Sequence, residues 1–142
     1  MLERIRKIKE VARVFGEMRH LLPALNFKMP AHAETVSVAG AFEDTVADHP
    51  ERIMLIFEGQ EWTYSEFNDS ANRFARVLQA RGVKRGDSVA LLMENRAEFI
   101  LSLLATLKVG ASCALINNSL TGAGLVHCVQ AAGANHIIVG DE

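Results

Sequence analysis

The sequence predicts an α/β fold with a doubly wound, mostly parallel sheet, preceded by an amphipathic helix. Three observations support this prediction: segments typical of strands and helices alternate after residue 52, residues 88–93 are almost continuously hydrophobic, and apolar residues recur at helical spacing near the N-terminus. A length of 142 residues with 49% hydrophobic and 23% charged residues is typical of one core-forming, soluble domain.

The first segment, residues 1–23, is predicted to be a basic amphipathic helix. Pro23 and Pro30 interrupt it, so residues 24–37 are interpreted as a linker and residues 38–142 as the globular part. The net charge of −2 combines +4 in residues 1–30 with −6 in the remainder. The apolar face of the predicted helix comprises Leu2, Ile5, Ile8, Ala12, Phe15, Met18 and Leu22.

Two interpretations of this basic helix remain open. It could make peripheral contact with an anionic membrane surface, or it could pack against the rest of the protein. A nucleic acid partner is not expected, because the remainder of the chain is acidic and basic residues are not interleaved with aromatic ones.

A hairpin and a long helix are predicted next. Residues 53–57 and 61–63 alternate like strands around a turn at residues 58–60, in which Gly59 supplies turn conformations. Thr63 and Glu66 have the spacing of a capping box, and Gly82 is placed to end the helix in a left-handed conformation. The apolar face of this helix comprises Phe67, Ala71, Phe74, Ala75 and Leu78.

The remaining elements continue the alternation. After the strand at residues 88–93, Asn95 with Glu98 indicates a helix N-cap, and the helix extends to Val109, where Gly110 ends it. A strand at 111–116, a helix at 122–132 and a strand at 135–139 follow. The hairpin then counts as the first of four strands in the order β-α-β-α-β-α-β, with an unpaired edge and apolar faces left exposed.

Cysteine and histidine residues offer no convincing site. Cys113 and Cys128 lie in apolar segments without CxxC spacing, which favours reduced, buried thiols in a cytoplasmic protein. His127 precedes Cys128, but adjacent helical residues do not face each other, so a nucleophilic pair is not expected. The other histidines, His20, His32, His49 and His136, have no metal-ligating spacing.

The sequence contains neither a complete dinucleotide-binding motif nor an apolar run long enough to span a membrane. Gly122 and Gly124 hint at the glycine fingerprint, with Asp141 near the next strand as its ribose-binding acid, but His127 occupies the third glycine position. The longest apolar run, residues 99–107, is well short of the roughly 20 residues that span a bilayer. The N-terminus lacks the pattern of a secretory signal, so export is not expected.

Five ordered motifs carry a family resemblance from about Phe42 onward. They are Thr63-Tyr64-Ser65-Glu66-Phe67, Ala71-Asn72-Arg73, Gly82-Val83 with Gly86-Asp87, Met93-Glu94-Asn95-Arg96, and Leu107-Lys108-Val109-Gly110-Ala111. In this order they resemble the AMP-forming, or adenylate-forming, acyl-CoA synthetase superfamily. Ala114-Leu115-Ile116-Asn117, Leu120, Leu125-Val126-His127-Cys128 and Gly133-Ala134 resemble its fatty acid transport protein branch, also called very-long-chain acyl-CoA synthetases.

The resemblance implies a ligase that converts a fatty acid to acyl-AMP with ATP and then to acyl-CoA, with Mg²⁺ accompanying the ATP. ATP, CoA and Mg²⁺ are therefore implied for the full-length enzyme, and a fatty acid is its implied substrate. In the family the phosphate loop and catalytic lysine lie beyond the position matching residue 142. No catalytic, cofactor-binding or metal-ligating residue is therefore assigned here, and Thr63, Glu66, Gly82, Gly86, Asn95 and Gly110 are interpreted as scaffold positions.

We therefore expect the N-terminal part of the large domain of a fatty-acyl-CoA ligase for long or very-long-chain fatty acids, with a potential role in fatty acid uptake. This portion alone is expected to be inactive. It is expected in the cytoplasm, with peripheral contact at the inner membrane surface through residues 1–23 as an option. The alternative is a non-enzymatic, truncated paralogue that binds a lipid, a membrane or a protein partner.

Overall fold

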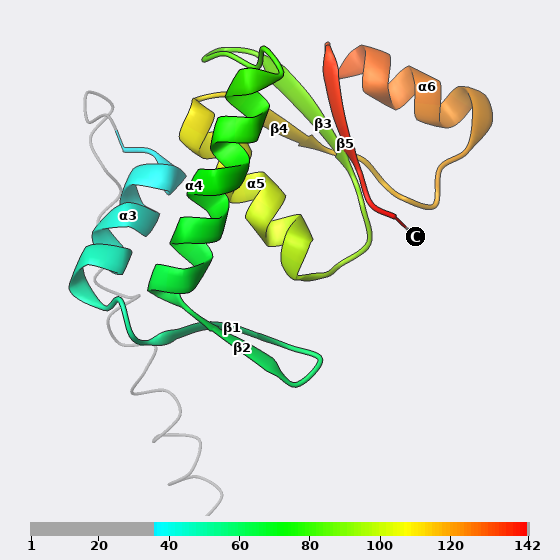
Figure 1. Ribbon diagram of the computed structural model, residues 1–142. Coiled ribbons are helices and arrows are strands. Elements are labelled where there is room, and N and C mark those ends of the chain that lie inside the picture. Colours follow the sequence, from blue (N-terminus) through cyan, green and yellow to red (C-terminus); the bar gives the residue numbers. More distant parts are fainter. Residues whose placement is uncertain (1–35, 142) are drawn as a thin grey trace, which may run out of the picture. The chain divides into compact units, whose positions relative to one another are not determined.

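The first element of the structure is a helix that the sequence pattern did not indicate. The computed structural model describes residues 36–141, and α3 spans Val38–Asp48 (Figure 1). Ser37 caps it, since its Oγ accepts a hydrogen bond from the Gly40 amide at 3.0 Å. Only Ala39 of this helix is buried, so its hydrophobic pattern is too weak to predict. The predicted helix at residues 1–23 and nearly all of the linker lie outside the described residues.

The predicted hairpin is confirmed, although it does not join the parallel sheet. Strands β1 (Ile53–Phe57) and β2 (Gln60–Thr63) pair antiparallel as a separate two-stranded sheet. Glu58 and Gly59 form the turn with φ of 50° and 77°, a combination typical of a two-residue hairpin turn. The prediction of four strands in one sheet is therefore wrong for the described residues, because the tight turn returns the chain antiparallel before the first crossover helix.

Helix α4 (Tyr64–Ala80) begins and ends as predicted. The Thr63 Oγ1 accepts from the Glu66 amide at 3.2 Å, while the Glu66 carboxylate accepts from the Thr63 amide at 2.9 Å, which completes the capping box. Gly82 has φ of 94°, and the amide of Val83 donates to the carbonyl of Leu78. This is a Schellman ending, and it directs both Leu78 and Val83 into the core.

A three-stranded parallel sheet forms the centre of the described unit. Strand β3 (Ser88–Leu92) lies between β4 (Ser112–Leu115) and β5 (His136–Val139), so the order is β4-β3-β5. Residues 89–91 of β3 are completely buried, which confirms the prediction of a strand covered on both faces.

Helix α5 (Ala97–Val109) ends at Gly110 as predicted, with φ of 82°, but its start differs from the prediction. Asn95 is not the N-cap. The backbone is still extended at Arg96, which is the capping residue and whose side chain makes no capping hydrogen bond. Asn95 is thus one residue too early to reach the first amides of the helix.

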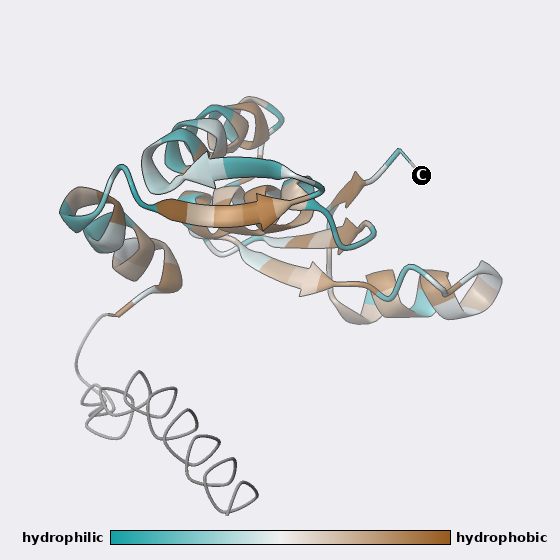
Figure 2. Ribbon diagram, turned by 90° about the horizontal axis from the view of Figure 1, so that it is seen from below, coloured by the Kyte–Doolittle hydropathy of each residue, from teal (hydrophilic) through white to brown (hydrophobic). Residues whose placement is uncertain are grey.

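Helices cover the two faces of the parallel sheet unequally. Figures 1 and 2 show α4 and α5 together on one side and α6 (Gly122–Ala131) on the other, as right-handed crossovers require. The α4/α5 side holds the main core, which comprises Ala75, Leu78, Val83, Val89, Ala105, Val109 and Ala111. No residue of α6 is buried, and Ile137 and Val139 of β5 are 48% and 58% exposed. The predicted α/β, doubly wound fold is confirmed, with one thinly covered sheet face.

None of the helices between residues 36 and 141 has the combined length and apolarity needed to cross a bilayer.

Candidate functional site

The loops that follow β3, β4 and β5 meet at the carboxyl edge of the parallel sheet. Strands β3 and β4 are parallel neighbours, and the loop after β3 leads to α5 on one face while the loop after β4 leads to α6 on the other. Neighbouring loops that depart to opposite faces create a crevice between the strand ends. In open α/β sheets, this is where ligands bind.

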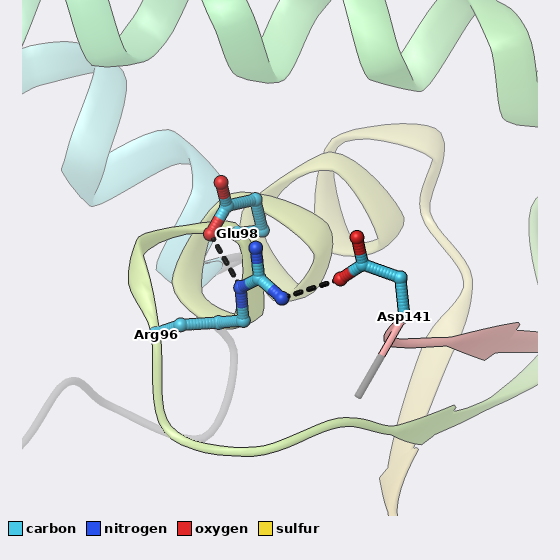
Figure 3. A network of polar contacts seen from close by, with 3 residues as sticks. All are labelled: Arg96, Glu98 and Asp141. Atoms are coloured by element: carbon cyan, nitrogen blue, oxygen red, sulfur yellow. Dashed lines mark hydrogen bonds and ion pairs between the residues drawn. The ribbon is translucent and has the colours of Figure 1, made fainter.

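Arg96 lies at this edge and joins two segments that are far apart in the sequence. Its Nε donates to Glu98 at 2.9 Å, and its Nη1 donates to Asp141 at 2.6 Å (Figure 3). Asp141 lies two residues after the end of β5, so this ion pair connects the segment that follows β5 to the start of α5. Arg96 lies in one of the family motifs and Asp141 is the candidate ribose ligand, and no local pattern in the sequence indicates that the two side chains meet.

The two carboxylates and the guanidinium shift one another's protonation. Hydrogen bonds from Arg96 lower the pKa of Asp141, with its own backbone amide a smaller cause. The pKa of Glu98 is also lowered, first by its own backbone amide and then by Arg96. Glu98 and Asp141 together raise the pKa of Arg96. All three side chains are solvent-accessible, so Arg96, Glu98 and Asp141 form an ion-pair cluster at the surface rather than a buried acid–base pair.

A first cavity of about 330 Å³ lies between the hairpin and the β3–α5 loop. The hairpin contributes Phe57 and Trp62 as aromatic walls. Carboxylates dominate its charged lining, with Arg96 as the one cationic side chain among the described residues that line it. The complete lining is Phe57, Glu58, Gln60, Trp62, Glu94, Asn95, Arg96, Ala97 and Glu98.

A second cavity of about 300 Å³ lies in the crevice between the ends of β3 and β4. Apolar side chains and three asparagine carboxamides line it, and none of the described lining residues is charged. The lining comprises Met93, Asn95, Phe99, Leu115, Ile116, Asn117 and Asn118. Asn95 belongs to both cavities, which are therefore neighbours along the sheet edge.

The cysteines and histidines singled out in the sequence do not gather at this edge. Cys113 and Cys128 are free and half-buried, less buried than predicted. Burial raises the pKa of the Cys113 thiol, with a weaker opposing contribution from a hydrogen bond with Thr106. His127 is exposed on α6, whereas the Nε2 of His136 lies 3.2 Å from the carbonyl oxygen of Arg81. Within residues 36–141, no cluster of three His, Cys, Asp or Glu side chains could hold a metal ion.

The glycines at the start of α6 are not packed closely against other parts of the described chain. Gly122 has φ of 56°, but a Cβ there would meet nothing within 4 Å. A Cβ on Gly124 would meet only the side chain of Leu120, at 3.9 Å. Neither glycine is therefore required by close packing against another part of the described chain. Asp141, the candidate ribose ligand, is held by Arg96.

Comparison with known proteins adds a second line of observation. A family model described as AMP-binding enzyme matches residues 42–142. The medium/long-chain-fatty-acid–CoA ligase FadD6 of Mycobacterium tuberculosis is 36% identical over 125 residues, covering 88% of this chain and 20% of the ligase. Long-chain fatty acid transport protein 6 of Mus musculus is 32% identical over 110 residues, covering 77% and 18%. The chain thus spans about a fifth of the length of these curated relatives.

Solved structures agree with the fold. The N-terminal subdomain of Klebsiella oxytoca NpsA, solved in complex with anthranilyl-AMSN, superimposes with a TM-score of 0.71 at 30% sequence identity. The match covers 74% of this chain and 28% of that subdomain.

Proposed function

Because the chain belongs to the AMP-binding enzyme family, we propose that it forms the N-terminal part of a ligase that activates long- or very-long-chain fatty acids. The observation that carries the proposal is the 36% identity to a fatty-acid–CoA ligase over 125 residues, supported by the likeness to a long-chain fatty acid transport protein. A role in fatty acid uptake is a finer proposal from the same relatives.

ATP, CoA and Mg²⁺ are the cofactors of the proposed whole enzyme. Within residues 36–141 no cluster of carboxylate, histidine or cysteine side chains could hold the metal. We therefore assign these residues to the scaffold and derive no catalytic step from them. The prediction that the catalytic residues lie beyond residue 142 stays a prediction.

The proposed scaffold role of the described unit is to position the loops at the carboxyl edge of its parallel sheet. Its parallel strands deliver the loops after β3, β4 and β5 to one edge, and Arg96 holds the first and last of these loops together through Asp141. Rigid strands fix the positions of loop residues more closely than loops alone can. The unit thus supplies a rigid edge on which the rest of a ligase can be built.

The experiment that tests this proposal compares two preparations. The native polypeptide, captured from its source cells with an antibody against residues 42–141, is expected to form acyl-CoA from palmitate in an ATP- and CoA-dependent manner, with stoichiometric release of pyrophosphate. The purified 142-residue chain is expected to release none. An amino acid and benzoate serve as alternative acids, since relatives also include peptide synthetases such as surfactin synthase subunit 2 of Bacillus subtilis.

The outcomes distinguish the fatty-acid ligase from the alternative, a non-enzymatic binding module that binds a lipid, a membrane or a protein partner. Palmitoyl-CoA formation by the native polypeptide supports the ligase, and activation of only the other acids would refute the fatty acid assignment. A native polypeptide of 15.6 kDa without activity would instead favour the binding module, which the exposed apolar residues of β5 already suit. Sustained, palmitate-dependent turnover by the purified 142-residue chain would overturn the scaffold assignment.

We further propose that the protein is cytoplasmic and contacts the inner membrane surface through residues 1–23, which lie outside the described residues. Four net positive charges in residues 1–30 and a regular apolar spacing support this proposal. Deletion of residues 1–23 is expected to lower binding to anionic vesicles in a co-sedimentation assay, with neutral vesicles as the control. Unchanged binding would eliminate the membrane role.

A further inference from the structure

We propose that the cavity between the carboxyl ends of β3 and β4 binds a small, uncharged amphiphile, with an apolar body and a hydrogen-bonding head such as a carboxamide or hydroxyl. This ligand differs from the fatty acid anion of the proposed ligase. The inference therefore stands independently of that function.

The position of the cavity is the first argument. It lies where the loops after β3 and β4 depart to opposite faces of the sheet, as the lining from both strand ends shows. Backbone groups at such a crevice are not covered by a crossover helix from either side, so a ligand can reach the strand ends. Its volume of about 300 Å³ matches the lower end of the range for small-molecule sites.

The chemistry of the lining defines the ligand. Met93, Phe99, Leu115 and Ile116 provide an apolar wall, and Leu115 is 55% exposed, so it presents apolar surface that water now covers. Asn95, Asn117 and Asn118 provide carboxamides that can both donate and accept. The Oδ1 of Asn117 already accepts from the Ser119 amide at 2.9 Å, which leaves its N–H groups for a ligand.

Electrostatics exclude charged heads. The neighbouring cavity, which shares Asn95, is lined by the carboxylates of Glu58, Glu94 and Glu98. Arg96 is the one cationic side chain among the described residues of this lining, so three carboxylates stand against one guanidinium there. An anionic head in the second cavity would meet this negative potential at short range, while a cationic head would be drawn to the carboxylates of the first cavity. An uncharged head fits the second cavity best.

Three probes of equal chain length test the proposal on the full 142-residue chain by isothermal titration at neutral pH without ATP. Decanamide is expected to bind at least about tenfold more tightly than decanoate. The carboxylate of decanoate would be repelled by the nearby glutamates, and a weak repulsion between surface charges a few ångströms apart lowers the affinity by about this factor. Decyltrimethylammonium is expected to bind more weakly than decanamide at this site. Equal or tighter binding of decanoate, or no binding of decanamide, would overturn the proposal.

Matched variants locate the binding. Leu115→Lys places a charge in the cavity and is expected to weaken decanamide binding about tenfold or more. Val139→Lys is the control, because Val139 ends the other edge strand at a similar exposure of 58% and does not line the cavity. Unchanged decanamide binding in Leu115→Lys would place the site elsewhere and refute the proposal.

A second pair guards against loss of folding in the lysine variants. Asn95→Ala removes an exposed carboxamide from the cavity, whereas Asn135→Ala removes an exposed one outside it. Asn95→Ala is expected to weaken decanamide binding severalfold, which is roughly the effect of losing one hydrogen bond to the ligand, while Asn135→Ala leaves the affinity unchanged. Equal affinities in the two variants would contradict the assignment. Because ligase activity is not measured, failure here leaves the proposed function untouched, and failure of the ligase assay leaves this site untouched.

Discussion

A single side chain can connect two segments at the carboxyl edge of the sheet, and Arg96 does so. It reaches Glu98 in the first turn of α5 and Asp141 at 45 residues' separation, so one planar guanidinium connects α5 to the end of β5. A lysine could not serve in the same way, because one ammonium lacks the fork that donates to two separate carboxylates. This ion-pair cluster is exposed to solvent, so we expect it to change the pKa values of its carboxylates more than the free energy of unfolding of the whole chain.

Replacing Arg96 is expected to change the titration of Asp141. In Arg96→Gln, the pKa of Asp141 should rise towards its ordinary value, because the guanidinium that stabilises the carboxylate is gone. A carboxyl with a lowered pKa in the folded state stabilises the fold above its unfolded pKa, and this contribution is lost as pH falls through the folded pKa. The acid loss of stability should therefore be shallower in Arg96→Gln.

Carboxyl-carbon NMR titration of Asp141 checks this prediction, together with thermal unfolding across the acid range. Arg73→Gln is the control, because Arg73 donates only to Ser70 among the described contacts and lies on α4. An unchanged titration of Asp141 in Arg96→Gln would show that the ion pair is not populated in solution.

At the scale of elements, caps and turns define where each helix begins and ends. Helix α4 has a reciprocal capping box at its start and a Schellman motif at its end, whereas α5 and α6 begin without a side-chain cap. Gly110 is required at the end of α5, since its φ is 82° and a Cβ would meet the Arg85 side chain at 3.0 Å. Helix α4, which has a capping motif at both ends, thus also contributes several buried side chains to the core.

The capping box of α4 gives a direct stability prediction. Thr63→Ala is expected to lower the free energy of unfolding by about 1 kcal/mol, because the Glu66 amide loses its acceptor at the start of the helix. Thr63→Ser keeps the hydroxyl and should lose only a small part of this. Urea unfolding followed by circular dichroism measures both variants. Equal losses would assign the effect to the β-branched methyl group rather than to the cap.

The attachment of α3 depends on an ion pair of unequal burial. The Lys108 ammonium of α5 contacts the Glu43 carboxylate of α3 and lies 6.0 Å from the centre of the Phe42 ring. The Lys108 side chain is only 5% exposed, while that of Glu43 is 59% exposed. A nearly buried ammonium therefore depends on a carboxylate that reaches it from the surface.

Removing the carboxylate is expected to cost more than removing the ammonium. Glu43→Gln leaves the Lys108 charge without its anionic partner and should lower the free energy of unfolding by about 1 kcal/mol, less than for a fully buried pair because water reaches Glu43. Lys108→Met retains the apolar stem and should cost less. Urea unfolding compares them with Glu61→Gln, an exposed glutamate without an ion pair in the described part of the chain. A larger loss in Lys108→Met would contradict this account.

At the scale of the whole described unit, the two faces of the parallel sheet differ. Helices α4 and α5 bury one face, while α6 contributes no buried residue on the other (Figure 1). Exposed apolar side chains lie on this side, with Ile137 48% and Val126 53% exposed. Apolar side chains exposed on one side of a sheet are typical of a surface that packs against another element or protein.

This asymmetry predicts how the isolated chain behaves. Ile137→Lys is expected to lower both binding of the dye ANS and self-association, because it replaces an exposed apolar side chain of β5 with a charged one. Val77→Lys is a matched control, since Val77 is equally exposed but lies on α4. Dye titration and sedimentation velocity make the measurement. An equal response of both variants would mean that general charge, and not this face, controls association.

Patterns within one segment were sufficient to predict most elements. The spacing of Thr63 and Glu66, the apolar run of β3 and the glycines at 82 and 110 depend on neighbours within a few residues, so the sequence reveals them. Helix α3 was missed because it buries one residue only, and Asn95 was misassigned because the chain stays extended for one more residue. The scaffold role of Asn95 as an N-cap is thereby withdrawn, and the hairpin forms its own sheet.

The fold class, the start and end of α4, the burial of β3 and the family could all be predicted from the amino-acid sequence, since these depend on local periodicity and ordered motifs. The tertiary structure alone decided which side chains meet: Arg96 with Asp141, Lys108 with Glu43, and the apolar and asparagine side chains at the ends of β3 and β4. The physical reason is that parallel strands bring loops from distant segments to one edge, and no local pattern records which loops become neighbours.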